Sequence, residues 1–222
     1  MILPKSRIAP LAFIFTLMVT FACTSQKELM LVKIGGETQG TYYAITYYTS
    51  DSADLQPSVD SLLHRFDSTA STYKPNSIIS RFNDNDTSAI ADEMFTTIFK
   101  KATEISGITN GAFDITVGPL VKAWGFGLTN RMKMDQHVLD SLLPLVGYKK
   151  VQLENGKILK SDPRIRIDYN AIAQGYAVDV LGAYLDSKGI EYYLIDIGGE
   201  VLAQYTKHVG TKWNVAIEMP AK

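Results

Sequence analysis

Residues 168–179 read DYNAIAQGYAVD, and this stretch predicts a strand that runs directly into a helix. Arg164 to Asp168 has the composition of a strand, and Ala173 to Ser187 has the clearest helical pattern in the chain, ended by Gly189. A helix N-terminus carries unpaired N–H groups and a partial positive charge, which suit a diphosphate. A backbone carbonyl of the same turn could ligate Mg²⁺, which prefers oxygen ligands. Many strand-to-helix turns share these features, so the stretch alone is a weak indication of a site.

The hydrophobic patterns on either side of this stretch predict both strands and helices. Leu29 to Ile34 and Thr41 to Tyr48 are rich in aliphatic, β-branched and aromatic residues, and the glycines between them predict a hairpin. Helices are expected over residues 59–66, 93–106 and 135–143, the last capped by Asp135, and a short helix or extended piece over residues 78–82. Further strands are expected over residues 151–153, 157–159, 192–197, 200–205 and 213–218. The elements predict an α+β fold with largely antiparallel sheets flanked by helices.

The N-terminal residues have the pattern of an export signal. Lys5 and Arg7 precede an apolar stretch from Ile8 to Ala22, which is too short for a comfortable membrane span. The stretch ends at Cys23, the one cysteine of the sequence, as in a lipoprotein processing site. We therefore expect a signal peptide over residues 1–22, lipidation of Cys23, a tether over residues 23–28 and a domain over residues 29–222. The alternative is a plain signal peptide whose cysteine is incidental, and Thr20 stands where such sites usually carry an aliphatic residue.

Charge and histidine spacing exclude other classes of function. The sequence has 22 Lys and Arg residues against 23 Asp and Glu, a net charge of −1, and no run of basic residues. Binding to nucleic acid needs a basic patch, so we expect no nucleic-acid partner. The three histidines, at positions 64, 137 and 208, show no spacing typical of metal ligands.

Two further segments combine residues in a way that a hydrophobic core does not require. Tyr73 lies in a turn before Pro75, where an exposed ring could stack on a planar ligand such as a flavin, or could cap the edge of the core. Asp114 follows glycine in the sequence NGAFD, residues 110–114, and could bind an amide or a ribose hydroxyl, or could cap the helix near Pro119. A glycine pair in residues 196–200 has the pattern of a structural turn between two strands.

Taken together, these segments resemble the ApbE family, the FAD:protein FMN transferases. The resemblance covers, in order, residues 39–43, 71–83, 111–127, 168–179, 196–200 and 213–218. It implies an α+β fold related to the T-fold and a specific activity. Such enzymes split the pyrophosphate of FAD, pass FMN to a threonine hydroxyl of a partner protein and release AMP, with Mg²⁺ neutralising the phosphates. The partner implied is an exported subunit of a membrane redox complex. Together with the expected lipidation of Cys23, this predicts a lipid-anchored protein on the periplasmic side of the inner membrane.

The resemblance also assigns roles to individual residues. Tyr73 is expected to pack against the flavin, and the backbone carbonyl of Ala171 to ligate Mg²⁺. The other residues expected to contact FAD are Gln39, Ala112, Phe113, Asp114, Asp168 and Gln174. No residue is assigned as catalytic.

The sequence departs from the family pattern at some of these positions and in its extent. Gln39 stands where the family usually has methionine, Gln174 where it often has lysine, and Ile115 where it usually has proline. The family pattern continues with segments that supply the side-chain Mg²⁺ ligands, whereas this sequence runs to Lys222. We expect the chain to be a fragment of a longer transferase. The alternatives are an FAD pyrophosphatase, a flavin-binding lipoprotein without turnover, and an inactive truncated protein.

Overall fold

A four-stranded antiparallel sheet forms one layer of the protein, in the computed structural model that describes residues 28–126, 130–208 and 210–216. Its order is β1 (Met30–Thr38), β2 (Thr41–Thr49), β5 (Tyr193–Ile197), β6 (Glu200–Gln204). The predicted hairpin is confirmed, but β1 continues through Gly35 and Gly36, so the turn falls at Gln39 and Gly40. A Cβ at Gly36 would come within 2.8 Å of the Tyr43 ring, and glycine therefore lets β1 pass over that side chain.

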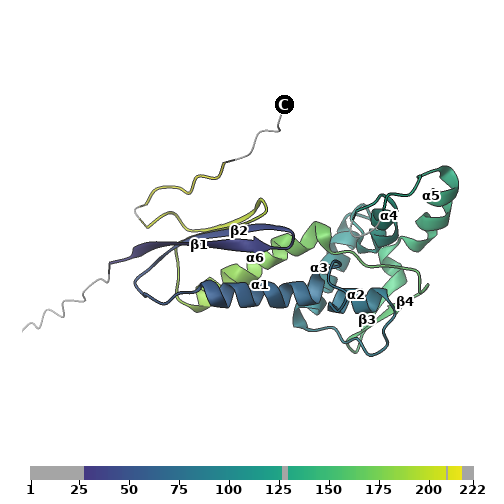
Figure 1. Ribbon diagram of the computed structural model, residues 1–222, viewed down its shortest axis with the longest axis horizontal. Coiled ribbons are helices and arrows are strands. Elements are labelled where there is room, and N and C mark those ends of the chain that lie inside the picture. Colours follow the sequence, from purple (N-terminus) through teal and green to yellow (C-terminus); the bar gives the residue numbers. More distant parts are fainter. Residues whose placement is uncertain (1–27, 127–129, 209, 217–222) are drawn as a thin grey trace, which may run out of the picture.

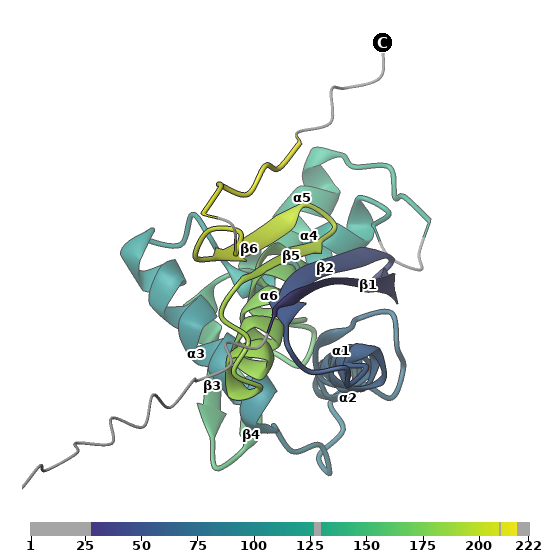
Figure 2. The same ribbon diagram turned by 90° about the vertical axis from the view of Figure 1, so that its left-hand side faces the viewer.

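Two long helices cover one face of this sheet. Helix α1 (Gln56–Ala70) and helix α6 (Asn170–Ser187) lie side by side beneath the strands (Figures 1 and 2). Alternate residues of β2 point into the layer between them, where Tyr43, Ile45 and Tyr47 are fully buried. Burial of these large side chains against the two helices forms the main core.

The remaining elements lie around the N-terminal end of α6, as Figure 1 shows. The helices are α2 (Ile78–Asn83), α3 (Glu93–Ile108), α4 (Gly118–Ala123) and α5 (Gln136–Leu142). Short 3₁₀ turns cover residues 115–117, 143–145 and 148–150, and a small hairpin is formed by β3 (Val151–Glu154) and β4 (Lys157–Lys160). Asp135 caps α5 as expected, because its side chain accepts a hydrogen bond from Val138 N. The predicted class, α+β with antiparallel sheets and flanking helices, is confirmed.

Two expected strands are not formed. Residues 164–168 run into α6 without pairing to another strand, and α6 begins at Asn170, before the predicted start at Ala173. Residues 213–216 form no strand, while residues 217 and 218 lie outside the described chain. The predicted signal peptide and Cys23 also lie outside it. No helix in the described ranges is both long and apolar enough to cross a membrane.

Candidate functional site

A cavity of about 710 Å³ opens where the β1–β2 turn, the end of α1 and the first turn of α6 meet. Three residues singled out from the sequence line it: Gln39 from the hairpin turn, Tyr73 from the turn after α1, and Gln174 from α6. The fold thus brings together segments that are far apart in the chain. The full lining is Gln39, Gly40, Phe66, Asp67, Ala70, Ser71, Tyr73, Lys74, Asn170, Ala173 and Gln174.

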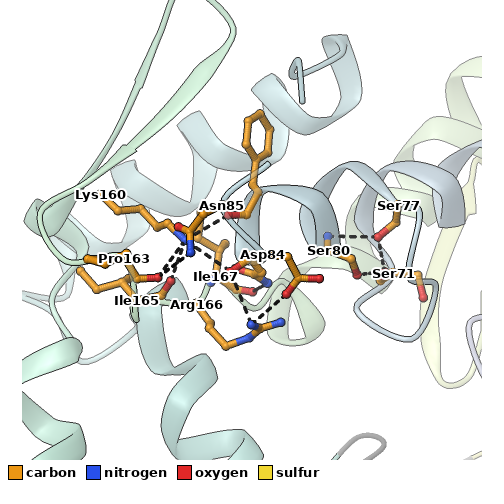
Figure 3. Close-up of polar contacts among 12 residues, drawn as sticks. Ser71, Ser77, Ser80, Asp84, Asn85, Lys160, Pro163, Ile165, Arg166 and Ile167 are labelled. Carbon is orange, nitrogen blue, oxygen red and sulfur yellow. Dashed lines mark hydrogen bonds and ion pairs between the residues drawn. The ribbon is translucent and has the colours of Figure 1, made fainter. Parts of the chain in front are cut away.

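The turn that carries Tyr73 is held by serine side chains. Ser77 Oγ donates to the carbonyl of Ser71 at 2.6 Å and accepts a hydrogen bond from Ser80 N at 3.2 Å, so it closes the turn and caps α2 (Figure 3). Ser80 Oγ lies 3.5 Å from the same Ser71 carbonyl. The Tyr73 side chain remains 51% exposed at the cavity. An exposed ring carried by a turn that is held in this way can stack on a planar ligand.

The N-terminus of α6 forms the opposite wall, and Asp168 lies just before it. The carboxylate of Asp168 accepts a hydrogen bond from Asn170 N at 2.7 Å, which satisfies one of the free N–H groups of the helix. Burial raises the pKa of Asp168 above its ordinary value. The backbone N–H of Asp168 donates to the carbonyl of Ile115 at 2.7 Å, which ties this wall to the segment that follows Asp114.

Gln174 packs against the turn between β5 and β6. A Cβ at Gly198 would lie 2.7 Å from Thr41 Cγ2 and 3.3 Å from Gln174 Nε2, and Gly198 has a φ of +57°, so the glycine is required there. Asp196 closes the turn by accepting a hydrogen bond from Gly199 N at 2.9 Å. The glycine pair therefore has the structural role that its sequence indicated, and its turn lies beside Gln174 and Thr41, next to the β1–β2 turn.

Asp114 forms hydrogen bonds with Thr116 and Tyr148 and does not line the cavity. Its carboxylate accepts hydrogen bonds from Thr116 N at 2.7 Å, Thr116 Oγ1 at 2.6 Å and Tyr148 N at 2.6 Å. These bonds cap the 3₁₀ turn and fix the loop before β3. Ala112 is exposed, and Phe113 packs partly buried against the core. Contact of Ala112, Phe113 and Asp114 with FAD stays a prediction.

Two buried polar atoms of the cavity residues lack partners. Gln39 Nε2 and Asp67 Oδ1 are shielded from solvent and have no hydrogen-bond partner in the described chain. A buried donor or acceptor without a partner costs about 1–3 kcal/mol. At a cavity, a ligand or a water molecule can complete such groups. In the core, the hydroxyl groups of Tyr47 and Tyr169 also lack partners among the described residues. The sequence reasoning missed Asp67 and Lys74, and the signal that could have found Lys74 was its position directly after Tyr73.

Ala171 lies on another side of α6, where it lines a smaller cavity of about 420 Å³ between α3, α6 and β6. Within the described ranges no group of three or more His, Cys, Asp or Glu side chains could hold a metal ion. A lone backbone carbonyl does not meet the near-octahedral oxygen coordination of Mg²⁺. These residues do not form an Mg²⁺ site by themselves, and the assignment of Ala171 stays a prediction.

The fold and the cavity define an α+β protein with a candidate site for a ligand that combines a planar ring with an anionic group. The sequence matches the model of the ApbE family over residues 39–222. The chain belongs to the ApbE family.

Relatives and solved structures agree with this assignment. The chain is 36% identical to an FAD:protein FMN transferase of Vibrio cholerae over 88% of its length, and 32% identical to that of Haemophilus influenzae, also over 88%. It spans 61% and 60% of the length of these relatives. The structure of flavin transferase ApbE from Vibrio cholerae superposes with a TM-score of 0.80 at 36% identity, over 87% of this chain and 65% of that one. The apo flavinyl transferase ApbE of Pseudomonas stutzeri gives 0.78 at 28% identity, over 86% and 63%.

Proposed function

We propose that the protein binds FAD in the cavity between Tyr73 and helix α6 and transfers FMN to a threonine hydroxyl of a partner protein. The threonine oxygen attacks the phosphorus of the FMN moiety, and the bond from that phosphorus to the bridging oxygen breaks. AMP leaves with the bridging oxygen, and the hydroxyl proton is released. The proposed Mg²⁺ dependence rests on the resemblance of the Ala171 segment to the family.

The observation that carries the proposal is the exposed ring of Tyr73 beside Lys74 and opposite the N-terminus of α6. Stacking on the ring suits the isoalloxazine or adenine group of FAD. The lysine and the helix terminus suit its phosphates, because both present positive charge and N–H donors. The relatives named above support flavin and protein as the two substrates, since their names specify FMN transfer from FAD to protein.

The proposal extends to where the protein works. A lipid on Cys23 would anchor it to the periplasmic face of the inner membrane, next to exported redox-complex subunits that accept flavin. The support is the apolar stretch before Cys23 and the residues around it. Labelling of the protein with radioactive palmitate, lost in a Cys23→Ser variant, tests this part.

The transfer itself is tested by flavinylation in vitro. The chain, and in parallel any longer form encoded by the same reading frame, is incubated with FAD, Mg²⁺ and an acceptor that carries a Ser-Gly-Ala-Thr motif. We expect in-gel flavin fluorescence on this acceptor and none on a control whose motif threonine is replaced by alanine. Free FMN without a labelled acceptor would indicate a pyrophosphatase, and FAD binding without either product would leave a flavin-binding protein.

A further inference from the structure

Charged side chains are few among the residues that line the main cavity. Within the described lining they are Asp67, from the last turn of α1, and Lys74, from the turn that follows it. Gln174, which faces them from α6, is neutral. Any anionic ligand in the cavity therefore finds its positive charge at Lys74 and at the N-terminus of α6.

Lys74 is only loosely held by its neighbour. Its Nζ lies 3.4 Å from Asp67 Oδ2, which is long for a charge-assisted hydrogen bond, and the two side chains are 39% and 18% exposed. Such an ion pair at the surface contributes little to stability. An ammonium group carries three donors, and among the described residues the Lys74 ammonium makes this ion pair and no hydrogen bond. Its donors are thus available to a ligand.

Asp67 has a second feature that bears on Lys74. Its Oδ2 faces the ammonium, whereas its Oδ1 is buried without a partner. The carboxylate therefore holds one negative charge beside the cavity with incomplete hydrogen bonding. A phosphate that approaches Lys74 meets repulsion from this charge, and Asp67 competes with the phosphate for the ammonium.

We propose that Lys74 breaks its ion pair with Asp67 and binds the phosphate of the flavin ligand in this cavity. The Asp67–Lys74 pair is therefore a determinant of specificity for phosphorylated flavins. This inference rests on the proposed flavin-binding function. Tyr73 holds the ring of the ligand, and the adjacent Lys74 distinguishes a flavin that carries phosphate from one that does not. Asp67 lowers the affinity of the cavity for the phosphate. When no phosphate is bound, Asp67 keeps Lys74 at the cavity wall.

The test compares dissociation constants for riboflavin, FMN and FAD, which share one ring system and differ in phosphate. They are measured by quenching of flavin fluorescence on the full chain and on its Lys74→Met, Lys74→Arg and Asp67→Asn variants. Lys188→Met serves as the matched control, because it removes an exposed lysine just beyond the other end of α6. Riboflavin affinity reports at the same time that each variant keeps a folded site.

Lys74→Met is expected to weaken FMN and FAD binding about tenfold and to leave riboflavin binding unchanged, as expected for loss of one charge-assisted contact. Lys74→Arg is expected to retain binding within about threefold, and Asp67→Asn to strengthen FMN binding about threefold. Lys188→Met is expected to bind all three flavins as the wild type does.

Equal affinities of wild type and Lys74→Met for FMN would overturn the role of Lys74 while leaving flavin binding intact. Weaker FMN binding in Asp67→Asn would overturn the competition between Asp67 and the phosphate. A wild-type chain that binds none of the three flavins would overturn the proposed function itself, and the inference with it. The two failures are therefore distinguishable.

Discussion

Asn83 pairs through its side chain with both backbone groups of Ile167. Its Nδ2 donates to the carbonyl of Ile167 at 2.8 Å, and Ile167 N donates to its Oδ1 at 2.7 Å, with both contacts buried. The end of α2 is thereby joined to the segment that leads into α6. The Asn83 amide thus supplies to Ile167 the bonds that a neighbouring strand would supply, and residues 164–168 join no sheet.

Replacing Asn83 should therefore destabilise the protein strongly. Asn83→Ala leaves a buried N–H and a buried C=O of Ile167 without partners, and we expect a loss of about 2–4 kcal/mol in the free energy of unfolding. Urea denaturation followed by circular dichroism measures it. Asn76→Ala, at an exposed turn position, should change stability by less than about 0.5 kcal/mol. Similar values for the two variants would contradict the role of the Asn83–Ile167 pair.

Gly118 allows α4 to approach residues 164–168 closely, and replacing it tests this packing. A Cβ at this position would lie 2.6 Å from the carbonyl oxygen of Arg166, so Gly118→Ala has to push two backbone segments apart. We expect a loss of about 1–3 kcal/mol. Gly107→Ala is the control, because Gly107 lies in α3 with no atom within 4 Å of the added Cβ. It should be neutral or stabilise by up to about 1 kcal/mol, and thermal melts that rank the two variants the other way would refute this packing.

Gln39 is expected to lower the stability of the unliganded protein, because its side chain is available for a ligand rather than paired within the fold. Gln39→Met removes the buried Nε2 donor that lacks a partner and keeps a side chain of similar length. We expect the unliganded protein to gain about 1 kcal/mol in the free energy of unfolding. Gln152→Met, at an exposed position of β3, should change it little. A loss of stability in Gln39→Met would show that Nε2 is already satisfied.

Lys160 should give the protein a distinct dependence on pH. Its Nζ donates to the carbonyls of Phe82 at 3.0 Å and Ile165 at 3.1 Å (Figure 3). Burial, with the nearby Arg166, lowers the pKa of Lys160 to about 8. The folded protein thus releases this proton at lower pH than the unfolded chain, whose lysine retains it up to about pH 10. Between these values the unfolded state binds more protons, so this group makes stability rise with pH.

The measurement is the free energy of unfolding from pH 8 to pH 10 for wild type and Lys160→Met. The variant has no proton to release at this position, so its curve should lack the rise that wild type shows, whatever its overall loss of stability. Parallel curves would mean that Lys160 keeps an ordinary pKa in the folded state.

The sequence was most informative where local chemistry determines the structure. The cap at Asp135, the N-terminal hairpin and the helix ended by Gly189 all follow from local propensity, and each is found in the structure, although the hairpin turn is confined to Gln39 and Gly40. Residues 164–168 were predicted wrongly, since their partner is the side chain of Asn83, distant in sequence.

The candidate site was predictable in part for the same reason. Tyr73 was singled out by its turn and assigned to the flavin through the family resemblance, and Gln39 and Gln174 were assigned through their positions in the family pattern. Asp67 could not be identified, because its place at the cavity depends on how α1 ends against α6. The segment of Asp114 is joined to the start of α6 by the hydrogen bond from Asp168 N to the carbonyl of Ile115. The periodicity of the sequence does not predict this contact.

The most direct test of a flavin site at this cavity is the dissociation constant for FAD of wild type, Tyr73→Ala and Tyr205→Ala, measured by calorimetry. Tyr205 is also exposed but lies at the end of β6 away from the β5–β6 turn and outside the cavity. The account predicts that wild type and Tyr205→Ala bind FAD alike, and that Tyr73→Ala binds about tenfold more weakly for loss of ring stacking. Equal binding by all three proteins, or no binding by wild type, would contradict it.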